Sequence, residues 1–472
     1  MKWCSVLWLG IAVSLASLGA FPPARFHFDR ASYISQHDLV FQRPGRHWQL
    51  GIPMGNGDLG ALQWGSPDEV FYGINKADVW DRRFDKEQEV LVDVRTLEML
   101  LNRAPKTLKA LLEESYKAPA SKPYPTPKRC GALVIRTPGA KEYSSYLDRL
   151  QLHSATVDSE YHTAVDQRDS RAFVHKEENL LVVRVRFQSE LPIAREIELF
   201  RPPDTTKARS GIADAQAFVQ GMDFGVEQHF PAHWRFPEDF HYVMRGRVVG
   251  ADYSPRAEGH RALARLAGSS SGEILLLVAV ASSRDHRDPK QATRLMLDRA
   301  AAQGFDAIEK DHRRRWDEYW QAAMVELPDR ILEQNWYFQM YQMACISRPG
   351  KYLVGHCGLW NWGDFAPWNG DYHTDQNVQQ IFWGTFSSNH PELALPFCDM
   401  FHRMLPLAQE QARDRFFTRG ARYSLATHEY NGNMAGHPYF NELSNGPWIA
   451  HLFWWYYDYT RDRDFLRQTG YP

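Results

Sequence analysis

Cysteine is scarce in this sequence: its 472 residues include only five. Cys4 lies in the N-terminal apolar segment, which leaves Cys130, Cys345, Cys357 and Cys398. These four are too sparse for a disulfide-rich scaffold, and they lack the close spacing of a zinc ligand set. A disulfide between Cys345 and Cys357 in an oxidising compartment and buried free thiols are both open interpretations.

The sequence also lacks an excess of either charge. It carries 55 Lys and Arg against 57 Asp and Glu, a formal net charge of -2. Proteins that bind nucleic acids or anionic membranes usually show a strongly basic balance, so neither partner is predicted. In the basic stretch HRRRWDEYW (312–320), Arg313 and Arg314 each precede an acidic residue by four positions. This spacing indicates an ion-paired helix surface rather than a nucleic-acid site.

The apolar run at the N-terminus is short. Val6–Ala16 follows Lys2, precedes the small residues Gly19 and Ala20, and is too short to span a bilayer with ease. The pattern predicts a signal peptide over residues 1–20, with a retained membrane anchor as the alternative. We therefore expect a secreted or periplasmic protein with no membrane contact beyond the signal peptide.

Large aromatic residues, by contrast, are abundant. Of the 16 Trp, ten lie at or after Trp316. Core packing is the default role of such residues, but flat rings also stack on sugars in binding clefts. The segment GLWNWGDFAPWNGDYHTDQN (358–377) combines three Trp with three Asp. It is too polar for a core and too aromatic for a flexible linker.

The first part of the chain has the pattern of β-structure. Apolar runs bounded by Gly, Pro, Asp or Ser recur from about Phe28 to about Ser282. The clearest runs are 132–137, 172–187, 196–200, 242–250 and 273–281. Several alternate with polar residues, as antiparallel strands with one solvated face do. They predict a β-sandwich domain over residues 25–285, interrupted by a leucine-rich helical insertion around Arg95–Tyr116.

The pattern becomes helical near Asp288 and stays so. Two helices separated by Gly304 predict a helical linker over residues 286–325. Further segments with apolar residues at helical spacing predict an all-α domain over residues 326–472. The chain stops at RQTGYP, a turn sequence close behind the last predicted helix, so we expect it to be a fragment.

A glycine-rich segment, GIPMGNGDLGALQWGSPDEVFYGINKADVWD (51–81), places three glycines around Asn56 and Asp58. Glycine permits tight turns or close backbone approach. The segment superficially resembles a phosphate-binding loop, but strand-like FYGI follows instead of a helix. Nucleotide binding is therefore not predicted.

Four blocks of the sequence together resemble glycoside hydrolase family 95, the α-L-fucosidase-like enzymes of the six-hairpin glycosidase superfamily. PMGNGDLGALQWG with NKADVWD resembles the family's P-L-G-N-G-x-L-G and N-x-D-x-L/I-W segments. The other three blocks are CISRPGKYLVGHCGLWNW (345–362), PWNGDYHTDQNVQQIFW (367–383) and WIAHLFWWYYDYTRDRDFL (448–466). They follow the family's order, and the likeness is strongest to a secreted bacterial branch. The resemblance implies a multidomain β + α fold: an N-terminal β-sandwich, a helical linker and an (α/α)6 toroid, here incomplete.

The resemblance also implies residues that handle the attacking water. The family has two asparagines, two positions apart, in the block matched by 367–383. The second corresponds to Asn377, whereas the first position holds Asp375, a departure. An aspartate can itself act as a general base, which an amide cannot do without a partner. The family's general acid and its base-partner aspartate lie beyond the helix matched by 448–466 and have no counterpart in this chain.

The two polar-aromatic loops, 358–377 and 427–448, supply the other candidate site residues. Those expected to contact sugar are Trp360, Trp362, Trp368, Asp371, His373, His428 and Glu442. Glu429, or alternatively Glu442, is the candidate acid within this chain. Asp364 is interpreted as a turn residue. The set His428, Glu429 and His437 matches no standard zinc spacing, so no metal and no cofactor is predicted.

The predicted function is an inverting glycoside hydrolase that acts on an oligosaccharide or polysaccharide glycan. The sugar, fucose-like or galactose-like, and its linkage stay open. A polysaccharide lyase on an α/α toroid, with Tyr372 and His373 as the reacting pair, is one alternative. A non-catalytic glycan-binding protein is the alternative from another class.

Overall fold

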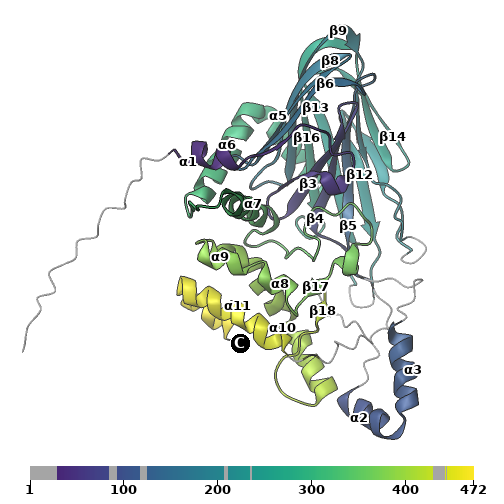
Figure 1. Cartoon of the computed structure of the whole chain (residues 1–472). Helices are drawn as coiled ribbons and strands as arrows, with labels where there is room; N and C mark the ends of the chain where they lie inside the picture. The colour runs from purple at the N-terminus through teal and green to yellow at the C-terminus, as the bar shows by residue number, and fades with distance from the viewer. Residues whose placement is uncertain are drawn as a thin grey trace, which may run out of the picture.

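The computed structural model of the chain describes residues 29–83, 93–116, 125–206, 211–233, 237–428, 442 and 444–471. Figure 1 shows a large β-sheet part above a smaller helical part. The predicted fold class is thus confirmed as a β-sandwich followed by a helical region. The predicted signal peptide, residues 1–20, lies outside the described residues.

Two antiparallel sheets form the sandwich. The nine-stranded sheet runs, in spatial order, β1 (Leu39–Phe41), β6 (Tyr143–Gln151), β7 (Thr156–Thr163), β8 (Asp166–Val174), β9 (Leu180–Ile193), β16 (Ser269–Ser282), β13 (Phe240–Val249), β12 (Asp223–Phe230) and β11 (Gln216–Gln220). The seven-stranded sheet runs β14 (Tyr253–Glu258), β15 (Arg261–Leu266), β10 (Glu196–Phe200), β5 (Thr126–Arg136), β4 (Glu69–Asp81), β3 (Leu59–Ser66) and β2 (Ile52–Gly55).

The central strand β16 shows how its sequence fits this layered arrangement. Its alternate residues Ile274, Leu276, Val278 and Val280 belong to the core between the sheets. The residues between them, Leu275, Leu277 and Ala279, pack against α5 (Pro289–Gln303) and α6 (Phe305–Trp320). Because successive side chains of a strand point to opposite faces, a strand covered on both faces must be apolar throughout. This accounts for the uninterrupted run EILLLVAVA.

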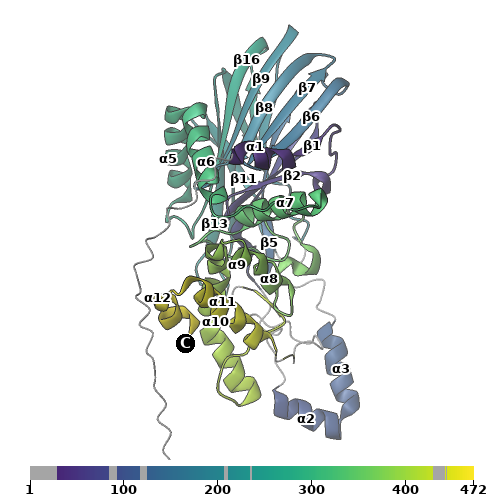
Figure 2. The same ribbon diagram turned by 60° about the vertical axis from the view of Figure 1, so that its left-hand side comes forward.

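Helices α5 and α6 therefore cover the outer face of the nine-stranded sheet, where Figures 1 and 2 show them. His312 fixes α6 to that face. It is fully buried, and its ring stacks on Phe173 of β8 with 4.3 Å between ring centroids. Burial lowers the pKa of His312 well below its ordinary value, and neighbouring His175 acts in the same direction. The folded protein thus holds this imidazole neutral.

We expect acid to destabilise the protein through His312. Below a pH of about 6.5 the unfolded chain binds a proton there and the folded protein does not, so the free energy of unfolding decreases as the pH falls. His312 contributes up to about 1.4 kcal/mol per pH unit to this slope. His312→Phe should remove that contribution between about pH 6.5 and pH 5, as measured by urea denaturation. The same substitution at exposed His451 is the control; an unaltered slope in His312→Phe would contradict the expectation.

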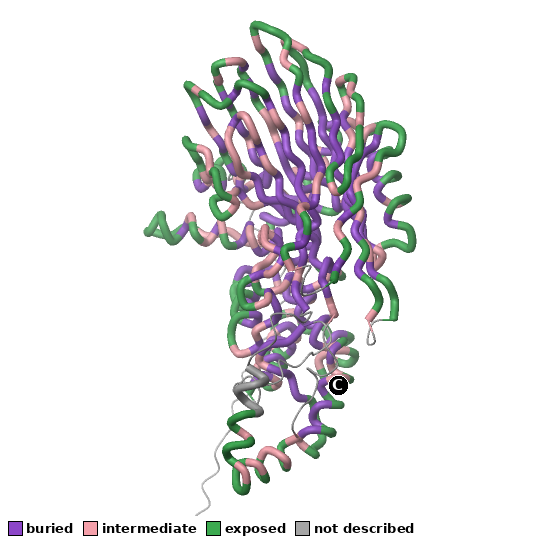
Figure 3. Tube along the Cα trace, turned by 90° about the vertical axis from the view of Figure 1, so that its right-hand side faces the viewer, coloured by how far each residue is buried: buried purple, intermediate pink, exposed green. Residues whose placement is uncertain are grey.

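The helical region begins after the linker. Its elements are α7 (Arg330–Ile346), η4 (Pro367–Gly370), β17 (Tyr372–His373), α8 (Asn377–Gln380), α9 (Trp383–Ser387), η5 (Pro391–Ala394), α10 (Leu395–Phe416), β18 (Ala426–Thr427), α11 (Asn445–Thr460), α12 (Arg463–Phe465) and the π-helical turn η7 (Leu466–Gly470). The core of this region and the core of the sandwich form one contiguous cluster. Figure 3 shows the buried residues running from the sheets into the helices without interruption. The two parts are therefore packed as one body.

The remaining helices lie at the edges. Short helices α1 (Arg30–Ile34), η1 (Ser35–His37) and η2 (Trp48–Leu50) flank the first strands. The predicted insertion forms α2 (Val94–Arg103) and α3 (Pro105–Tyr116), which lie beside the helical region in Figure 1. Among the described helices, none combines the length and the apolar composition needed to cross a membrane.

Candidate active site

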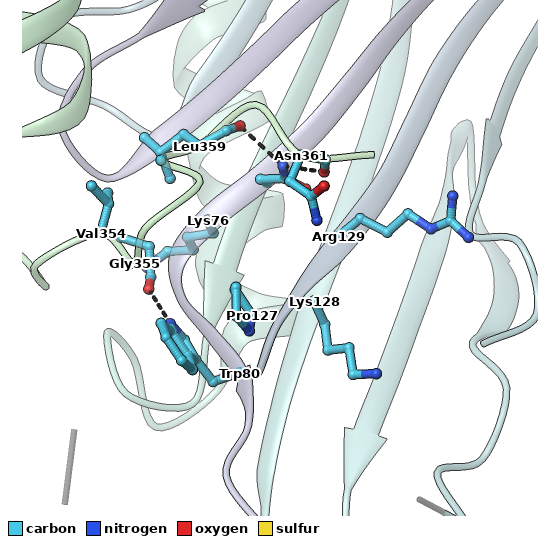
Figure 4. Close-up of a pocket in the computed structure, with 12 residues that line it drawn as sticks. Lys76, Trp80, Pro127, Lys128, Arg129, Val354, Gly355, Leu359 and Asn361 are labelled. Atoms are coloured by element: carbon cyan, nitrogen blue, oxygen red, sulfur yellow. Dashed lines mark hydrogen bonds between the residues drawn. The ribbon is translucent and has the colours of Figure 1, made fainter. Parts of the chain in front are cut away.

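The first half of segment 358–377 docks onto the sandwich. Figure 4 shows the 354–361 stretch beside β4 and β5, around a small cavity. The Asn75 amide donates to the carbonyls of Leu359 and Asn361, at 3.0 and 2.7 Å. The Trp360 indole donates to the Met54 carbonyl at 2.9 Å. Backbone and side-chain contacts together fix this stretch to the seven-stranded sheet.

Trp362 contacts the same sheet. Its ring lies 5.3 Å from that of Trp64, and the Arg129 guanidinium lies over it at 4.6 Å. Like Trp360, it is only partly exposed. Packing between the two parts of the molecule accounts for both rings, and their predicted role as sugar platforms stays a prediction.

Asp364 lies in a bend, in agreement with its interpretation as a turn residue, and it is also a buried ion-pair residue, which the sequence did not indicate. Its carboxylate accepts hydrogen bonds from Arg129 at 3.1 and 2.7 Å and lies 2.8 Å from Arg201. The Thr205 backbone N–H also donates to it, at 3.1 Å. The side chains of Asp364 and Arg201 have no exposed surface, and that of Arg129 has little. This cluster anchors the WGDF turn to strand β5 and to the loop after β10.

A second buried cluster involves the glycine-rich segment. Lys76 lies 3.0 Å from Asp58, 2.9 Å from Asp78 and 2.7 Å from Asp285. Gly57, at φ +86°, donates its N–H to the Cys345 carbonyl, and a Cβ there would lie 2.4 Å from Arg348. The glycine permits close contact with the helical region, one of the two roles expected from the sequence.

The second half of segment 358–377 turns away from the sandwich. Trp368 and Asn369 both adopt left-handed backbone conformations, with φ of 49° and 62°, and Gly370 follows at 68°. A bulky residue in this region is strained, and such strain is often found at functional sites. The strained turn leaves Trp368 71% exposed. Of the three predicted platforms, Trp368 is the one with a freely accessible ring.

The two polar-aromatic loops meet at a short ladder. Strand β17 pairs antiparallel with β18, which places Tyr372 opposite Thr427 and His373 opposite Ala426. The Thr374 N–H and hydroxyl extend the contact to the carbonyls of Leu425 and Ser424. Buried His428 directly follows β18. The described start of the second polar-aromatic loop, Thr427 and His428, therefore lies beside the first loop.

Around this ladder lie titratable side chains. Buried Asp371 has a carboxylate oxygen 3.2 Å from Nδ1 of His373. The His373 ring lies 4.8 Å from that of His356, which in turn contacts the edge of Trp368 at 5.7 Å. Trp368, Asp371 and His373 thus lie around His356, and their predicted contact with a sugar stays a prediction. His356 was missed because its signal, an isolated histidine between two glycine-containing turns, is weak in the sequence alone.

Asp375 lies two residues beyond His373 and is partly buried. Its Oδ1 atom is buried and accepts no hydrogen bond within the described structure. Buried polar atoms normally have partners, so this oxygen has acceptor capacity that the described residues do not use. Asn377 is exposed at the first position of α8. The pairing of Asp375 and Asn377 around one water molecule remains a prediction.

Of the two acidic candidates in the second loop, the structure describes only Glu442. Glu442 accepts a hydrogen bond from Ser444 at 2.9 Å, next to the start of α11. Glu429 and His437 lie outside the described residues.

Within the part that the structure describes, no three His, Cys, Asp or Glu side chains are grouped as metal ligands. Cys345 and Cys357 are free thiols.

Comparison with known families assigns both parts of the chain. The model of the glycosyl hydrolase family 65 N-terminal domain matches residues 39–284, and that of the glycosyl hydrolase family 95 catalytic domain matches residues 279–472. The chain belongs to the glycosyl hydrolases with this pair of domains. The candidate site lies entirely within the family 95 domain.

Individual relatives agree with this assignment. Alpha-L-fucosidase 2 of Arabidopsis thaliana is 20% identical, over 92% of this chain and 57% of the relative. Probable alpha-fucosidase A of Aspergillus niger is 22% identical, over 89% and 57%. This chain therefore spans about half of the length of these relatives. A solved structure assigned as a kojibiose phosphorylase, from the human microbiome, shares the fold at a TM-score of 0.60 and 13% identity, over 92% of this chain and 57% of its own.

Proposed function

We propose that this chain carries the water-activating side of an inverting glycoside hydrolase site. The observation that carries the proposal is the buried Oδ1 of Asp375, which accepts no hydrogen bond from the described residues, in the same segment that presents the exposed ring of Trp368 on its strained turn. The exposed Trp368 ring offers a surface on which a sugar ring can stack. The relatives from Arabidopsis thaliana and Aspergillus niger are named as fucosidases, which favours an α-L-fucoside as the first substrate to try.

In an inverting hydrolysis, Asp375 and a carboxylic acid on the opposite side of the sugar would have separate roles. Asp375 takes a proton from a water molecule as the water oxygen attacks the anomeric carbon. A carboxylic acid on the opposite side of the sugar gives a proton to the leaving oxygen, and the two carboxyl groups stand roughly 6.5–9.5 Å apart to leave room for the water. In this proposal the acid comes from outside the described residues, with Glu429 as the candidate within this chain. The chain spans 57% of its fucosidase relatives, and an acid from a longer chain is the alternative.

We also propose that the protein is secreted or periplasmic. The support is the N-terminal pattern of Lys2, a short apolar run and small residues up to Ala20. Mass spectrometry of the N-terminus of the protein isolated from its natural host would test it. An N-terminus near Phe21 supports the proposal, and a retained Met1 in a cytoplasmic fraction contradicts it.

A substrate screen on the complete protein encoded by the gene tests the activity. The panel contains aryl α-L-fucosides, aryl α-galactosides, aryl glucosides and fucosylated oligosaccharides, and proton NMR follows the first-formed anomer of the product. Release of a monosaccharide with inverted configuration is the expected result. An ultraviolet-absorbing unsaturated uronate from a polyuronide would indicate a lyase instead. Glycan binding without turnover would indicate a binding protein.

Trp368 supplies a prediction on affinity. Because its ring is exposed and its turn is strained, Trp368→Ala should remove a sugar-stacking surface at little cost in folding stability. We expect KM, or the Kd of a non-hydrolysed ligand, to rise roughly 5- to 30-fold, since stacking contacts contribute about 1–2 kcal/mol. Exposed Trp454 on α11 is the matched control. Equal KM values in the two alanine variants would remove Trp368 from the site.

A further inference from the structure

An open pocket of about 640 Å³ lies on the outer face of the nine-stranded sheet. Strands β12 and β13 form its floor, and the loop before α5 and the first two turns of α5 form its side. Helix α5 packs against β13 here (Figure 1). The volume is within the range of small-molecule sites, roughly 300–1,000 Å³. None of the residues that line the pocket belongs to the candidate active site.

Two stacked histidines form part of the floor. His229 of β12 is directly opposite His241 of β13 in the antiparallel ladder, and their rings lie 4.8 Å apart at an angle of 10°. The next residues along the strands, Phe230 and Phe240, belong to the core between the sheets. Because successive side chains of a strand point to opposite faces, both imidazoles point outward into the pocket. The ladder thus holds the two rings together before any ligand binds.

Two acidic side chains border the pocket, and both already have partners. Glu227 accepts a hydrogen bond from Lys290 at 2.8 Å, and it lies 3.9 Å from the ring of His229. Asp288 caps α5, where it accepts the N–H of Gln291 at 3.0 Å. These contacts occupy the negative charges of the pocket within the protein itself.

The cationic side of the pocket is not balanced in this way. Arg287 is exposed, and no hydrogen bond or ion pair joins its guanidinium to a described residue. His286 beside it also lines the pocket. A guanidinium keeps its proton in proteins and binds carboxylate, sulfate and phosphate groups through paired N–H donors. Imidazoles add further N–H donors when they are protonated. The pocket therefore lacks a negative group that a ligand can supply.

Protonation of the histidine pair connects the pocket to pH. Burial lowers the pKa of His241, and the positive charges of His229 and Lys290 act in the same direction. Glu227 and Asp288 oppose this shift. A bound anion stabilises the charged imidazole, so it raises the pKa of His241. By the same linkage, the anion binds more tightly as the pH falls.

We propose that this pocket is a binding site for an oxyanion, a carboxylate, sulfate or phosphate group held by Arg287 and by the His229–His241 pair. A free inorganic anion and the acidic group of a sugar present the same oxygen atoms, so this chemistry fits both sources. Binding forms no covalent bond, and at neutral pH it is accompanied by the uptake of a proton from solvent. The inference is independent of the proposed function, because it uses none of the same residues.

An NMR titration of the complete protein tests the site. The histidines are labelled with ¹³C at Cε1, and the His241 signal is assigned from its loss in His241→Gln. Sodium sulfate, phosphate and glucuronate, each compared with sodium chloride at the same ionic strength, should raise the pH midpoint of His241 by about half a pH unit or more. Exposed His451 on α11 is the internal control, and its midpoint should stay constant. An unchanged His241 midpoint with all three anions would overturn the inference.

Calorimetry at pH 6 tests the role of the guanidinium. Arg287→Gln should weaken the binding of each anion roughly 10- to 100-fold, because charge-assisted hydrogen bonds are lost. Arg256→Gln, at an exposed arginine of β14 in the other sheet, is the matched control and should bind as the wild type does. Both side chains are exposed, so neither substitution should affect folding. Unaltered affinity in Arg287→Gln, or an equal loss in Arg256→Gln, would refute the site.

The three anions also separate the two sources of the ligand. Similar Kd values for sulfate, phosphate and glucuronate would support a site that recognises the oxyanion alone. Tighter binding of glucuronate would support a site for an acidic sugar, because the sugar ring then adds contacts of its own. If sodium chloride shifts the His241 midpoint as far as the oxyanions do, charge screening explains the effect and the proposal fails.

Discussion

Asp375→Asn is expected to lower kcat by about 10²–10⁴ and to leave the fold intact. Asparagine has the shape of aspartate but cannot take a proton from water, and general base catalysis is worth about that factor. Because Asp375 is partly buried and its Oδ1 accepts no hydrogen bond in the described structure, the neutral amide should not destabilise the protein. Steady-state kinetics at several pH values, with the thermal midpoint as a check on folding, measure both effects.

The same position allows a sharper test. Asp375→Ala leaves space where the base stood, and azide is a nucleophile that needs no base. Azide should therefore restore turnover in Asp375→Ala and yield a glycosyl azide of inverted configuration, detectable by mass spectrometry and NMR. Asp414→Asn, on the exposed end of α10, serves as the remote control. If Asp375→Asn hydrolyses substrate as fast as the wild type, another group activates the water, as the amide at this position in related enzymes would require.

The strands of the sandwich were largely predictable because their signals are local. The run at 196–200 corresponds to β10, and the run at 273–281 falls within β16. A strand buried on one face alternates apolar and polar residues, and a strand buried on both faces is apolar throughout. Either pattern can therefore be recognised in the sequence of the strand itself. The pairing partners of a strand, by contrast, cannot be predicted from its own residues. β16 pairs with β9 and β13, which nothing in its own residues specifies.

The site shows the same division between local and non-local information. Segment 358–377 was predicted to supply sugar-contacting residues along most of its length, from Trp360 to His373. The structure divides it at about Ala366: the first half binds the sandwich, and the second half forms the candidate site. The residues that cause this division lie far away, since Arg129 reaches Asp364 across 235 residues. His356 was likewise invisible, because its place depends on the contact between Gly355 and Gly370.

Asp364→Ala is expected to lower the free energy of unfolding by about 3–5 kcal/mol, since removing one partner of a buried ion pair leaves an uncompensated charge. Here Arg129, whose side chain is 8% exposed, would lose its carboxylate, and fully buried Arg201 would keep only Asp204, at 3.3 Å. Urea denaturation followed by tryptophan fluorescence measures the change. Asp414→Ala, which breaks an exposed contact with Arg413, is the control and should leave the midpoint unaltered.

Loss of Asp364 should also affect the candidate site, through the backbone conformation of Trp368. The WGDF turn leads directly into Pro367–Gly370, whose strained geometry presents Trp368. Releasing the turn should therefore relax the left-handed conformation of Trp368, because strain persists only where the surrounding structure enforces it. Well below its unfolding midpoint, Asp364→Ala should show a raised KM similar to that of Trp368→Ala, whereas Asp414→Ala should not. A folded Asp364→Ala protein with wild-type KM would mean that the turn keeps its shape without the ion pair, and that Asp364 contributes to stability alone.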